Sequence, residues 1–220
     1  MKFDLRIHHR RSIRLKEYDY TQPGAYFITL VTQDRANLFG EIIDGVMRLN
    51  VLGEIICSNW LRLPNFFPIR HEEWVIMPNH LHAIIWILDS DTGEASVISN
   101  SSNSYNLFPD ALPQRKAIGT KPGSLGAIIQ NFKSISTRKI NRWTKDSRTG
   151  EASAKLRHET PKPLRADASP QHIWQRNYFE HIIGNVTEFK ALWKYIENNP
   201  RQWEKDQLNP NAPANPFNQE

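Results

Sequence analysis

Cysteine is almost missing from this chain of 220 residues, in which Cys57 is the only one. A single thiol cannot form an internal disulfide, so we expect a fold held by its hydrophobic core in a reducing compartment. Long apolar runs are missing too, and the longest, Ala83 to Leu88, is far shorter than the roughly 20 residues of a membrane-spanning helix. The N-terminus lacks the apolar core of a secretory signal. These absences predict a soluble cytoplasmic protein without a membrane partner.

An excess of charge of one sign is also small. The chain has 28 Lys and Arg against 23 Asp and Glu, a net charge of +5, which leans modestly toward polyanions such as nucleic acid. Hydrophobic residues make up 39% and aromatic residues 10%, as in a folded globular protein. We therefore predict one domain over residues 1–220.

Polar segments divide this domain. We predict a basic N-terminal arm over residues 1–20, flexible insertions at about 89–113 and 144–169, and a mobile C-terminal tail over 204–220. The segments between them carry strand or helix periodicity. Strands are expected at 25–32, 72–76 and from His80 onward, a hairpin at 42–49, and helices at about 50–62, from Ser124, and from a Thr187 cap to Asn199.

Basic residues gather in two places, the arm and the polar faces of the helix that begins at Ser124. We predict that they contact phosphates, the alternative being an ordinary solvated surface. They are Arg10, Arg11, Arg14, Lys133, Arg138 and Arg142.

Two histidines separated by Leu81 stand in an Ile-rich strand. Residues two apart on a strand share a face, so His80 and His82 project side by side. Neutral imidazoles in this arrangement are ordinary ligands of Mn²⁺ or Zn²⁺. The alternative is a pair of partly buried, hydrogen-bonded side chains. Histidine-triad nucleotide hydrolases are disfavoured because Ile84 stands where a third histidine is needed.

Tyr178 and His181 form the second candidate group. If Tyr178 begins a short helix, His181 at i+3 shares its face and completes a constellation with the two strand histidines. A phenol activated there could attack a phosphodiester and conserve its energy in a phosphotyrosine, and the chain accordingly lacks an ATP-binding phosphate loop. The alternative is that Tyr178 and Phe179 are packing aromatics.

Several separated motifs, in the right order, make the chain resemble the REP-associated tyrosine transposases, bacterial relatives of the HUH single-strand transposases. The match covers most of the chain outside the two insertions. The motifs are Met77-Pro78-Asn79-His80-Leu81-His82, Trp174-Gln175-Arg176-Asn177-Tyr178-Phe179-Glu180-His181 and Tyr195-Ile196-Glu197-Asn198-Asn199-Pro200, with Arg11-Ser12-Ile13-Arg14-Leu15, Tyr18-Asp19-Tyr20, Pro23-Gly24-Ala25-Tyr26-Phe27 and Leu38-Phe39-Gly40.

This resemblance implies an α+β, ferredoxin-like fold with helices packed on a central antiparallel sheet, and Mg²⁺ or Mn²⁺ held by His80 and His82. It implies that Tyr178 cuts and rejoins single-stranded DNA beside a hairpin through a 5′-phosphotyrosine, in a monomer or homodimer at the bacterial nucleoid. Many relatives carry Gln or Asn four residues after the tyrosine, whereas this chain has Ile182, so His181 is the expected third ligand. The alternative is a noncatalytic hairpin-binding protein derived from such a transposase.

Overall fold

A computed structural model describes residues 18–89, 121–149 and 172–212 of the chain. Its main sheet has four strands in the order β4-β5-β1-β6, and all neighbouring strands are antiparallel. Their bounds are β1 Gly24–Val31, β4 Ile69–Ile76, β5 His80–Ile87 and β6 Phe179–Ile182. A separate hairpin pairs β2 Gly40–Ile43 with β3 Val46–Leu49.

Two helices complete the motif. Helix α1, Val51–Leu61, connects β1 to β4 by way of the hairpin, and α2, Leu125–Thr149, connects β5 to β6. The main elements therefore run β-α-β-β-α-β, which is the ferredoxin-like order, and the α+β prediction is confirmed. Helix α3, Val186–Asn198, and the 3₁₀ turns η1, Gln33–Arg35, η2, Leu63–Asn65, and η4, Pro200–Lys205, complete the described structure. No helix in these ranges is long and apolar enough to cross a membrane.

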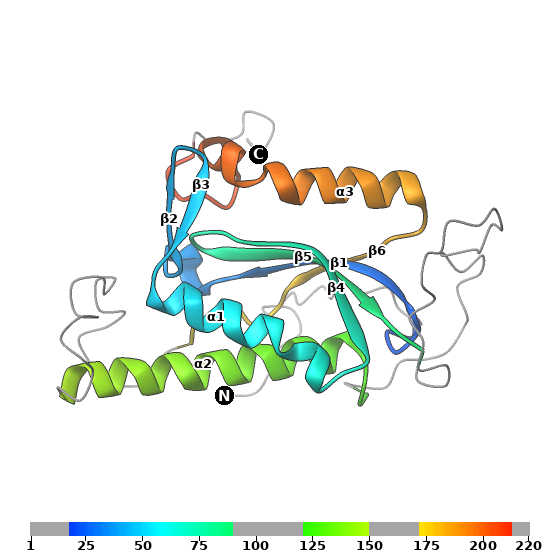
Figure 1. The fold of residues 1–220 in the computed structure, drawn as a ribbon, viewed down its shortest axis with the longest axis horizontal. Helices are drawn as coiled ribbons and strands as arrows, with labels where there is room; N and C mark the ends of the chain where they lie inside the picture. Colours follow the sequence, from blue (N-terminus) through cyan, green and yellow to red (C-terminus); the bar gives the residue numbers. More distant parts are fainter. Residues whose placement is uncertain (1–17, 90–120, 150–171, 213–220) are drawn as a thin grey trace, which may run out of the picture.

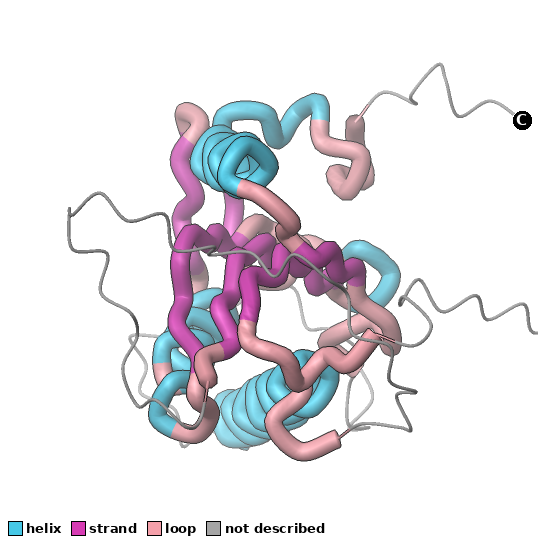
Figure 2. Tube along the Cα trace, turned by 90° about the vertical axis from the view of Figure 1, so that its right-hand side faces the viewer, coloured by secondary structure: helices cyan, strands magenta, loops and turns pink. Residues whose placement is uncertain are grey.

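The sheet has helices on both faces (Figures 1 and 2). On one face, alternate side chains of β1 and β5, such as Ile28 and Leu81, pack with α1 and α2 in the larger core cluster. On the other face, Phe27 and Ile84 pack with Ile196 of α3 in a smaller cluster. Because side chains alternate along a strand, His80 and His82 project toward the α3 face.

The turn before His80 is held from several sides. The backbone N–H groups of Leu38 and Phe39 both donate to the Pro78 carbonyl, at 2.8 and 3.0 Å. Asn50 caps α1 by accepting from the Gly53 N–H, as its sequence position predicts, and its side-chain NH₂ donates to the Leu38 carbonyl. The start of α1 is thus connected to the turn that begins the histidine strand.

Three boundaries differ from the sequence expectations. Tyr18 and Tyr20 were expected in the arm, but both are buried and packed edge-on against each other, because aromatic rings gain most from burial. Helix α2 continues through residues 144–149, expected as part of an insertion. The cap of α3 is Asn185, not Thr187, because the Asn185 carboxamide is placed to accept from the Glu188 N–H.

Other expectations fall in part beyond the described ranges. The arm up to residue 17, the first insertion from 90, the second from 150 and the last residues from 213 all lie outside them. The expected tail from residue 204 begins differently, because residues 204–212 are folded against the body of the protein, with hydrogen bonds from Asn79 to Leu208 and from Asn209 to Trp203.

Replacing Gly53 with alanine should destabilise the fold. Alanine favours a helix over glycine by about 1 kcal/mol, but a Cβ at Gly53 would lie 2.2 Å from the Phe39 carbonyl oxygen. We expect the free energy of unfolding in urea to fall by about 1–3 kcal/mol, as in other overpacked sites. Gly184→Ala is the control, because a Cβ there meets its nearest neighbour at 3.8 Å. Equal stability of both variants would contradict the close approach of α1 to the Phe39 carbonyl.

Candidate active site

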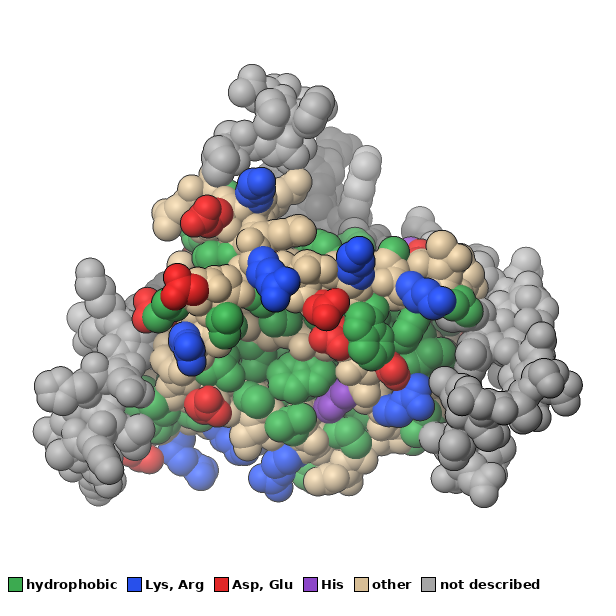
Figure 3. Space-filling model, turned by 45° about the horizontal axis from the view of Figure 1, so that its top comes forward, with side chains coloured by type: hydrophobic (Ala, Val, Ile, Leu, Met, Phe, Trp, Pro, Cys, Tyr) green, Lys and Arg blue, Asp and Glu red, His purple; other side chains and the backbone are tan. Residues whose placement is uncertain are grey.

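A cleft of about 970 Å³ lies between the α3 face of the sheet and the C-terminal segment, residues 206–208. Strand β1, strand β5, the segment before β6, helix α3 and residues 205–208 all contribute to its lining. Basic and acidic side chains are interspersed on the molecular face that includes α3 (Figure 3). The lining includes His82, Tyr178, His181, Tyr195, Asn199 and Asp206.

His80 and His82 stand side by side on β5, as predicted, with ring centroids 4.5 Å apart. Both are buried, with exposed fractions of 0% and 3%. The Nδ1 atom of His82 is hydrogen-bonded to the Thr29 hydroxyl at 2.8 Å, across the β1–β5 pair. The pair is therefore rigidly placed by the sheet.

Asn79 determines which nitrogen of His80 carries the proton. The Asn79 NH₂ donates to two backbone carbonyls, those of Arg35 and Leu208, which places Oδ1 toward Nδ1 of His80 at 2.8 Å. Because Oδ1 only accepts, Nδ1 must donate, and the lone pair of neutral His80 is on Nε2. This second hydrogen bond is the usual device that orients a metal-ligating imidazole.

Burial keeps both imidazoles neutral. It lowers the pKa of His80 from 6.5 to about 4, against the opposing effect of the Asp206 carboxylate. Burial also lowers the pKa of His82 well below 6.5, and the neighbouring His80 adds to this. At neutral pH both rings therefore have the lone pair that metal coordination requires.

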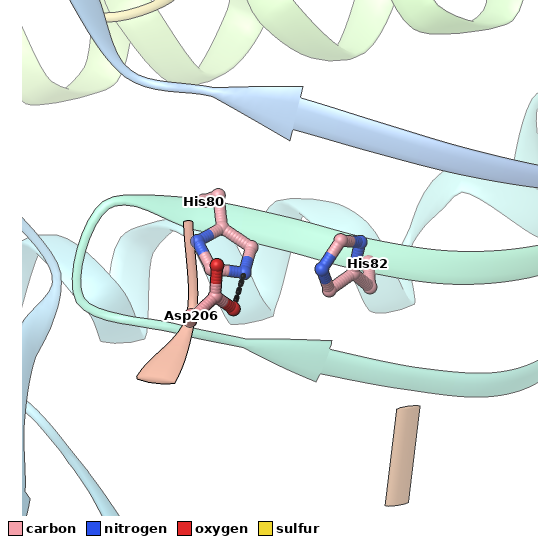
Figure 4. Close-up of side chains that lie close together, drawn as sticks. All are labelled: His80, His82 and Asp206. Carbon is pink, nitrogen blue, oxygen red and sulfur yellow. Dashed lines mark ion pairs between the residues drawn. The ribbon is translucent and has the colours of Figure 1, made fainter. Parts of the chain in front are cut away.

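Asp206 joins the two histidines, although it lies in the segment expected to be a mobile tail. Ligand atoms of His80, His82 and Asp206 all lie within 4.8 Å of one another. The Asp206 Oδ2 atom is 3.8 Å from Nε2 of His80 (Figure 4), and within the described ranges neither atom has a hydrogen-bond partner. Two imidazole nitrogens and a carboxylate oxygen are a donor set that fits a divalent cation such as Mn²⁺, Mg²⁺ or Zn²⁺.

The tyrosine beside this cluster is Tyr195 of α3. Its hydroxyl is hydrogen-bonded to Nε2 of His82 at 3.2 Å, and the two ring centroids are 5.2 Å apart. Burial raises the pKa of Tyr195, and the Asp206 carboxylate raises it further. The phenol is therefore protonated at neutral pH, and it needs a nearby cation or base to become a nucleophile.

Tyr178 lies in the same cleft but in a different environment. The Lys133 ammonium is 5.3 Å from the centre of its ring, and the same ammonium donates to the backbone carbonyls of Gln175 and Asn177. The structure thus shows Lys133 holding the segment that carries Tyr178. The roles of Tyr178 as nucleophile and Lys133 as phosphate contact stay predictions.

The short helix considered for Tyr178 to His181 is wrong, because residues 179–182 form the edge strand β6. Residues three apart on a strand point to opposite faces, so Tyr178 and His181 do not share one. The His181 Nε2 atom is instead 2.5 Å from the Glu188 carboxylate, and His181 is not in the three-residue group that could hold a metal. Its role as third ligand stays a prediction.

Asn199 is a residue that sequence reasoning missed. It stands four residues after Tyr195, which is the spacing of the ligand in the transposase pattern that Tyr178 lacks. It is 2% exposed, it lines the cleft, and its Oδ1 has no hydrogen-bond partner among the described residues. This spacing of Tyr195 and Asn199 is the signal in the sequence that could have identified both residues.

Two of the predicted DNA-contacting residues that the structure describes lie away from the cleft. Arg138 and Arg142 are exposed on α2, which covers the sheet face opposite the histidines. Arg10, Arg11 and Arg14 lie outside the described residues. The cations that line the cleft are instead Arg35 and Lys205, which the sequence analysis did not select.

Long-range ¹⁵N–¹H spectra of the imidazole rings, recorded with chelator present, should test the tautomer and charge of His80. Because burial lowers its pKa to about 4, the ring should stay neutral, with the proton on Nδ1, as the pH falls from 7 to 5. A titration midpoint near the ordinary value of about 6.5 would contradict the buried, neutral site.

Comparison with known proteins complements this geometry. No protein-family profile matches the chain. A solved structure of a REP-associated tyrosine transposase bound to a REP hairpin is similar at 15% identity and a TM-score of 0.46, over 89% of this chain and 74% of that one. An uncharacterized protein of Haemophilus influenzae is 38% identical over 208 residues, which are 94% of this chain and 97% of that protein. The chain therefore belongs to the same family as this Haemophilus influenzae protein.

Proposed function

We propose that the protein is a metal-dependent enzyme that nicks and rejoins single-stranded DNA beside hairpins, in the manner of the REP-associated tyrosine transposases that its motifs resemble. The observation that carries the proposal is that the Tyr195 hydroxyl lies against His82, whose imidazole forms one cluster with that of His80 and with the Asp206 carboxylate.

Tyr195 is the nucleophile that the geometry favours. Its hydroxyl is within hydrogen-bond distance of His82, and Asn199 follows it at the spacing of the transposase pattern. The Tyr195 oxygen forms a bond to phosphorus, and the bond from phosphorus to the 3′ oxygen breaks. The phenol loses its proton, and the leaving 3′ oxygen gains one, so the number of protons is unchanged. The products are a 5′-phosphotyrosine and a free 3′-OH.

His80 and His82 would hold Mg²⁺ or Mn²⁺, with Asn199 or Asp206 as the oxygen ligand. When bound, the ion polarises the scissile phosphate and neutralises charge on its nonbridging oxygens. The protein's own residues fix the geometry, because Asn79 sets the His80 tautomer and Thr29 sets the orientation of His82.

Rejoining reverses the cut. A 3′-OH attacks the phosphotyrosine, the bond between phosphorus and the tyrosine oxygen breaks, and the phenol is regenerated. Because the covalent intermediate conserves the energy of the phosphodiester, no nucleotide hydrolysis is needed, which agrees with the absence of a phosphate loop from the sequence.

The cleft has the chemistry of a single-strand binding surface. Phe179 lines it and is 49% exposed, and the buried Phe27 supports the Phe179 ring in edge-on contact. Unstacked bases can stack on such aromatic side chains, while the nearby cations Arg35 and Lys205 attract the backbone. One tyrosine at the metal cluster cuts one strand at a time, so the hairpin stem serves as the address and the unpaired flank as the substrate.

Tyr195→Phe should abolish formation of a denaturation-resistant protein–DNA adduct on a hairpin oligonucleotide with Mn²⁺, because it removes only the attacking oxygen. Tyr178→Phe is the matched control from the same cleft and should retain adduct formation. The measurement is a denaturing gel of each variant with labelled DNA, and binding of the uncut hairpin should be nearly unchanged in both.

The opposite pattern, with loss of adduct in Tyr178→Phe alone, would return the nucleophile to the residue expected from the sequence. Hairpin binding without any adduct in the unmodified protein would favour the noncatalytic alternative. Undiminished cleavage in EDTA would contradict the metal-dependent mechanism.

Cleavage should require an unpaired flank. The comparison uses one hairpin oligonucleotide with its flank single-stranded and the same oligonucleotide with that flank annealed to a complement. We expect cleavage only of the first, because a paired flank cannot offer unstacked bases to the exposed ring of Phe179. Equal cleavage of both substrates, or a tyrosine linked to the 3′ end, would contradict the proposed substrate.

A further inference from the structure

The C-terminal segment Asp206–Leu208 is attached to the loop that precedes the histidine strand. The buried Asn79 side chain donates to the Leu208 carbonyl at 2.6 Å, and the Arg35 guanidinium donates to the Gln207 carbonyl at 3.0 Å. Trp203, just before the segment, has its ring 6.0 Å from that of His80. These contacts bring a sequence-distant segment to the side of the metal cluster.

The Asp206 carboxylate divides its two oxygens between different tasks. Oδ1 accepts from the Leu208 N–H at 2.7 Å and so closes the local turn. Oδ2 faces Nε2 of His80 at 3.8 Å, is buried, and has no hydrogen-bond partner in the parts of the chain that the structure describes. A buried carboxylate oxygen is costly unless it is paired or bound to a cation.

His80 presents a lone pair to that oxygen. Its Nδ1 donates to the Asn79 Oδ1 at 2.8 Å, so the lone pair of the neutral ring is on Nε2, and the 3.8 Å between Nε2 and Oδ2 is too long for a hydrogen bond. Two lone pairs that face each other repel, and a divalent cation between them would be bound by both. The arrangement is thus that of two ligands of one ion.

We infer that Asp206 is a metal ligand supplied by the C-terminal segment, and that metal binding and docking of residues 206–208 stabilise each other. The inference deepens the proposed function and depends on its metal site. It adds a ligand that neither the histidine motif nor the tyrosine helix carries. The ligand set becomes two imidazole nitrogens and a carboxylate oxygen, with Asn199 beside them.

The coupling follows from how the segment is held. The hydrogen bonds from Asn79 and Arg35 both reach backbone carbonyls of the segment, so Asp206 is the residue through which its docking responds to the metal. By thermodynamic linkage, an ion that binds Asp206 only in the docked position must stabilise docking by the same factor by which docking raises its affinity. Residues 206–208 also line the cleft, so their docking completes one of its walls.

The test measures Mn²⁺ affinity of the full chain, from the electron paramagnetic resonance signal of free Mn²⁺, and hydrogen exchange of residues 204–212 with and without Mn²⁺. Asp206→Asn is the informative variant, because it removes the charge while an amide oxygen can still accept from the Leu208 N–H. Glu204→Gln is the matched control, since it removes an exposed carboxylate from η4, just before the segment.

We expect Asp206→Asn to weaken Mn²⁺ binding at least about 10- to 100-fold, the range seen when even an outer partner of a ligand is lost. Mn²⁺ should slow exchange of residues 204–212 in the unmodified protein and in Glu204→Gln, but not in Asp206→Asn. Protection in the unmodified protein is informative by itself, even if the variant folds poorly.

Two results would overturn the inference. One of them leaves the metal site of the proposed function intact, and the other rejects it. Mn²⁺ binding that is lost in His80→Ala but unchanged in Asp206→Asn, with no protection of the segment, would reject Asp206 as a ligand and leave the histidine site intact. Absence of Mn²⁺ binding to the unmodified protein would reject both the ligand and the metal site.

Discussion

The side chain of Asn79 connects the parts of the chain that meet at the site. Its oxygen accepts from His80, and its NH₂ donates to the carbonyls of Arg35 and Leu208. One carboxamide therefore sets the tautomer of His80, holds the end of the turn η1 that follows β1, and anchors the C-terminal segment. Because the residue is fully buried, each of these bonds is protected from competition by water.

The two faces of the sheet have different physical roles. The face under α1 and α2 buries the larger core cluster, including Trp60 and Phe132. The α3 face has a smaller apolar cluster and places polar groups such as His80 and Asn199 in buried positions. Burying such groups costs stability, so the apolar face offsets what the polar face loses.

Much of the fold follows from local patterns in the sequence. The alternation in β1 and β5, the apolar stripe of α2 and the Asn50 cap each predict an element that the structure contains. The hairpin was predicted from Asp44-Gly45, whose φ angles of 52° and 72° fit the tight turn that favours these residues. These signals are local, so they can be recognised in the sequence without knowledge of the tertiary contacts.

Only part of the candidate site could be predicted from the sequence. The histidines lie two residues apart, so strand geometry alone brings them together. Tyr195 and Asp206 reach them only through the packing of α3 and the course of the chain after it. Local periodicity in the sequence does not predict this packing. Strand β6 has four residues, too few to distinguish a strand from a helical turn, so Tyr178 and His181 were assigned to a shared face that they do not have.

The order of the site residues along the chain has a consequence for synthesis. His80 and His82 leave the ribosome more than a hundred residues before Tyr195, and Asp206 follows later still. The edge strand β6 is also late, so a nascent chain has the two imidazoles before it has Tyr195, the Asp206 carboxylate or this strand of the sheet. A growing chain therefore lacks the residues proposed to cut DNA until Tyr195 and Asp206 have been added.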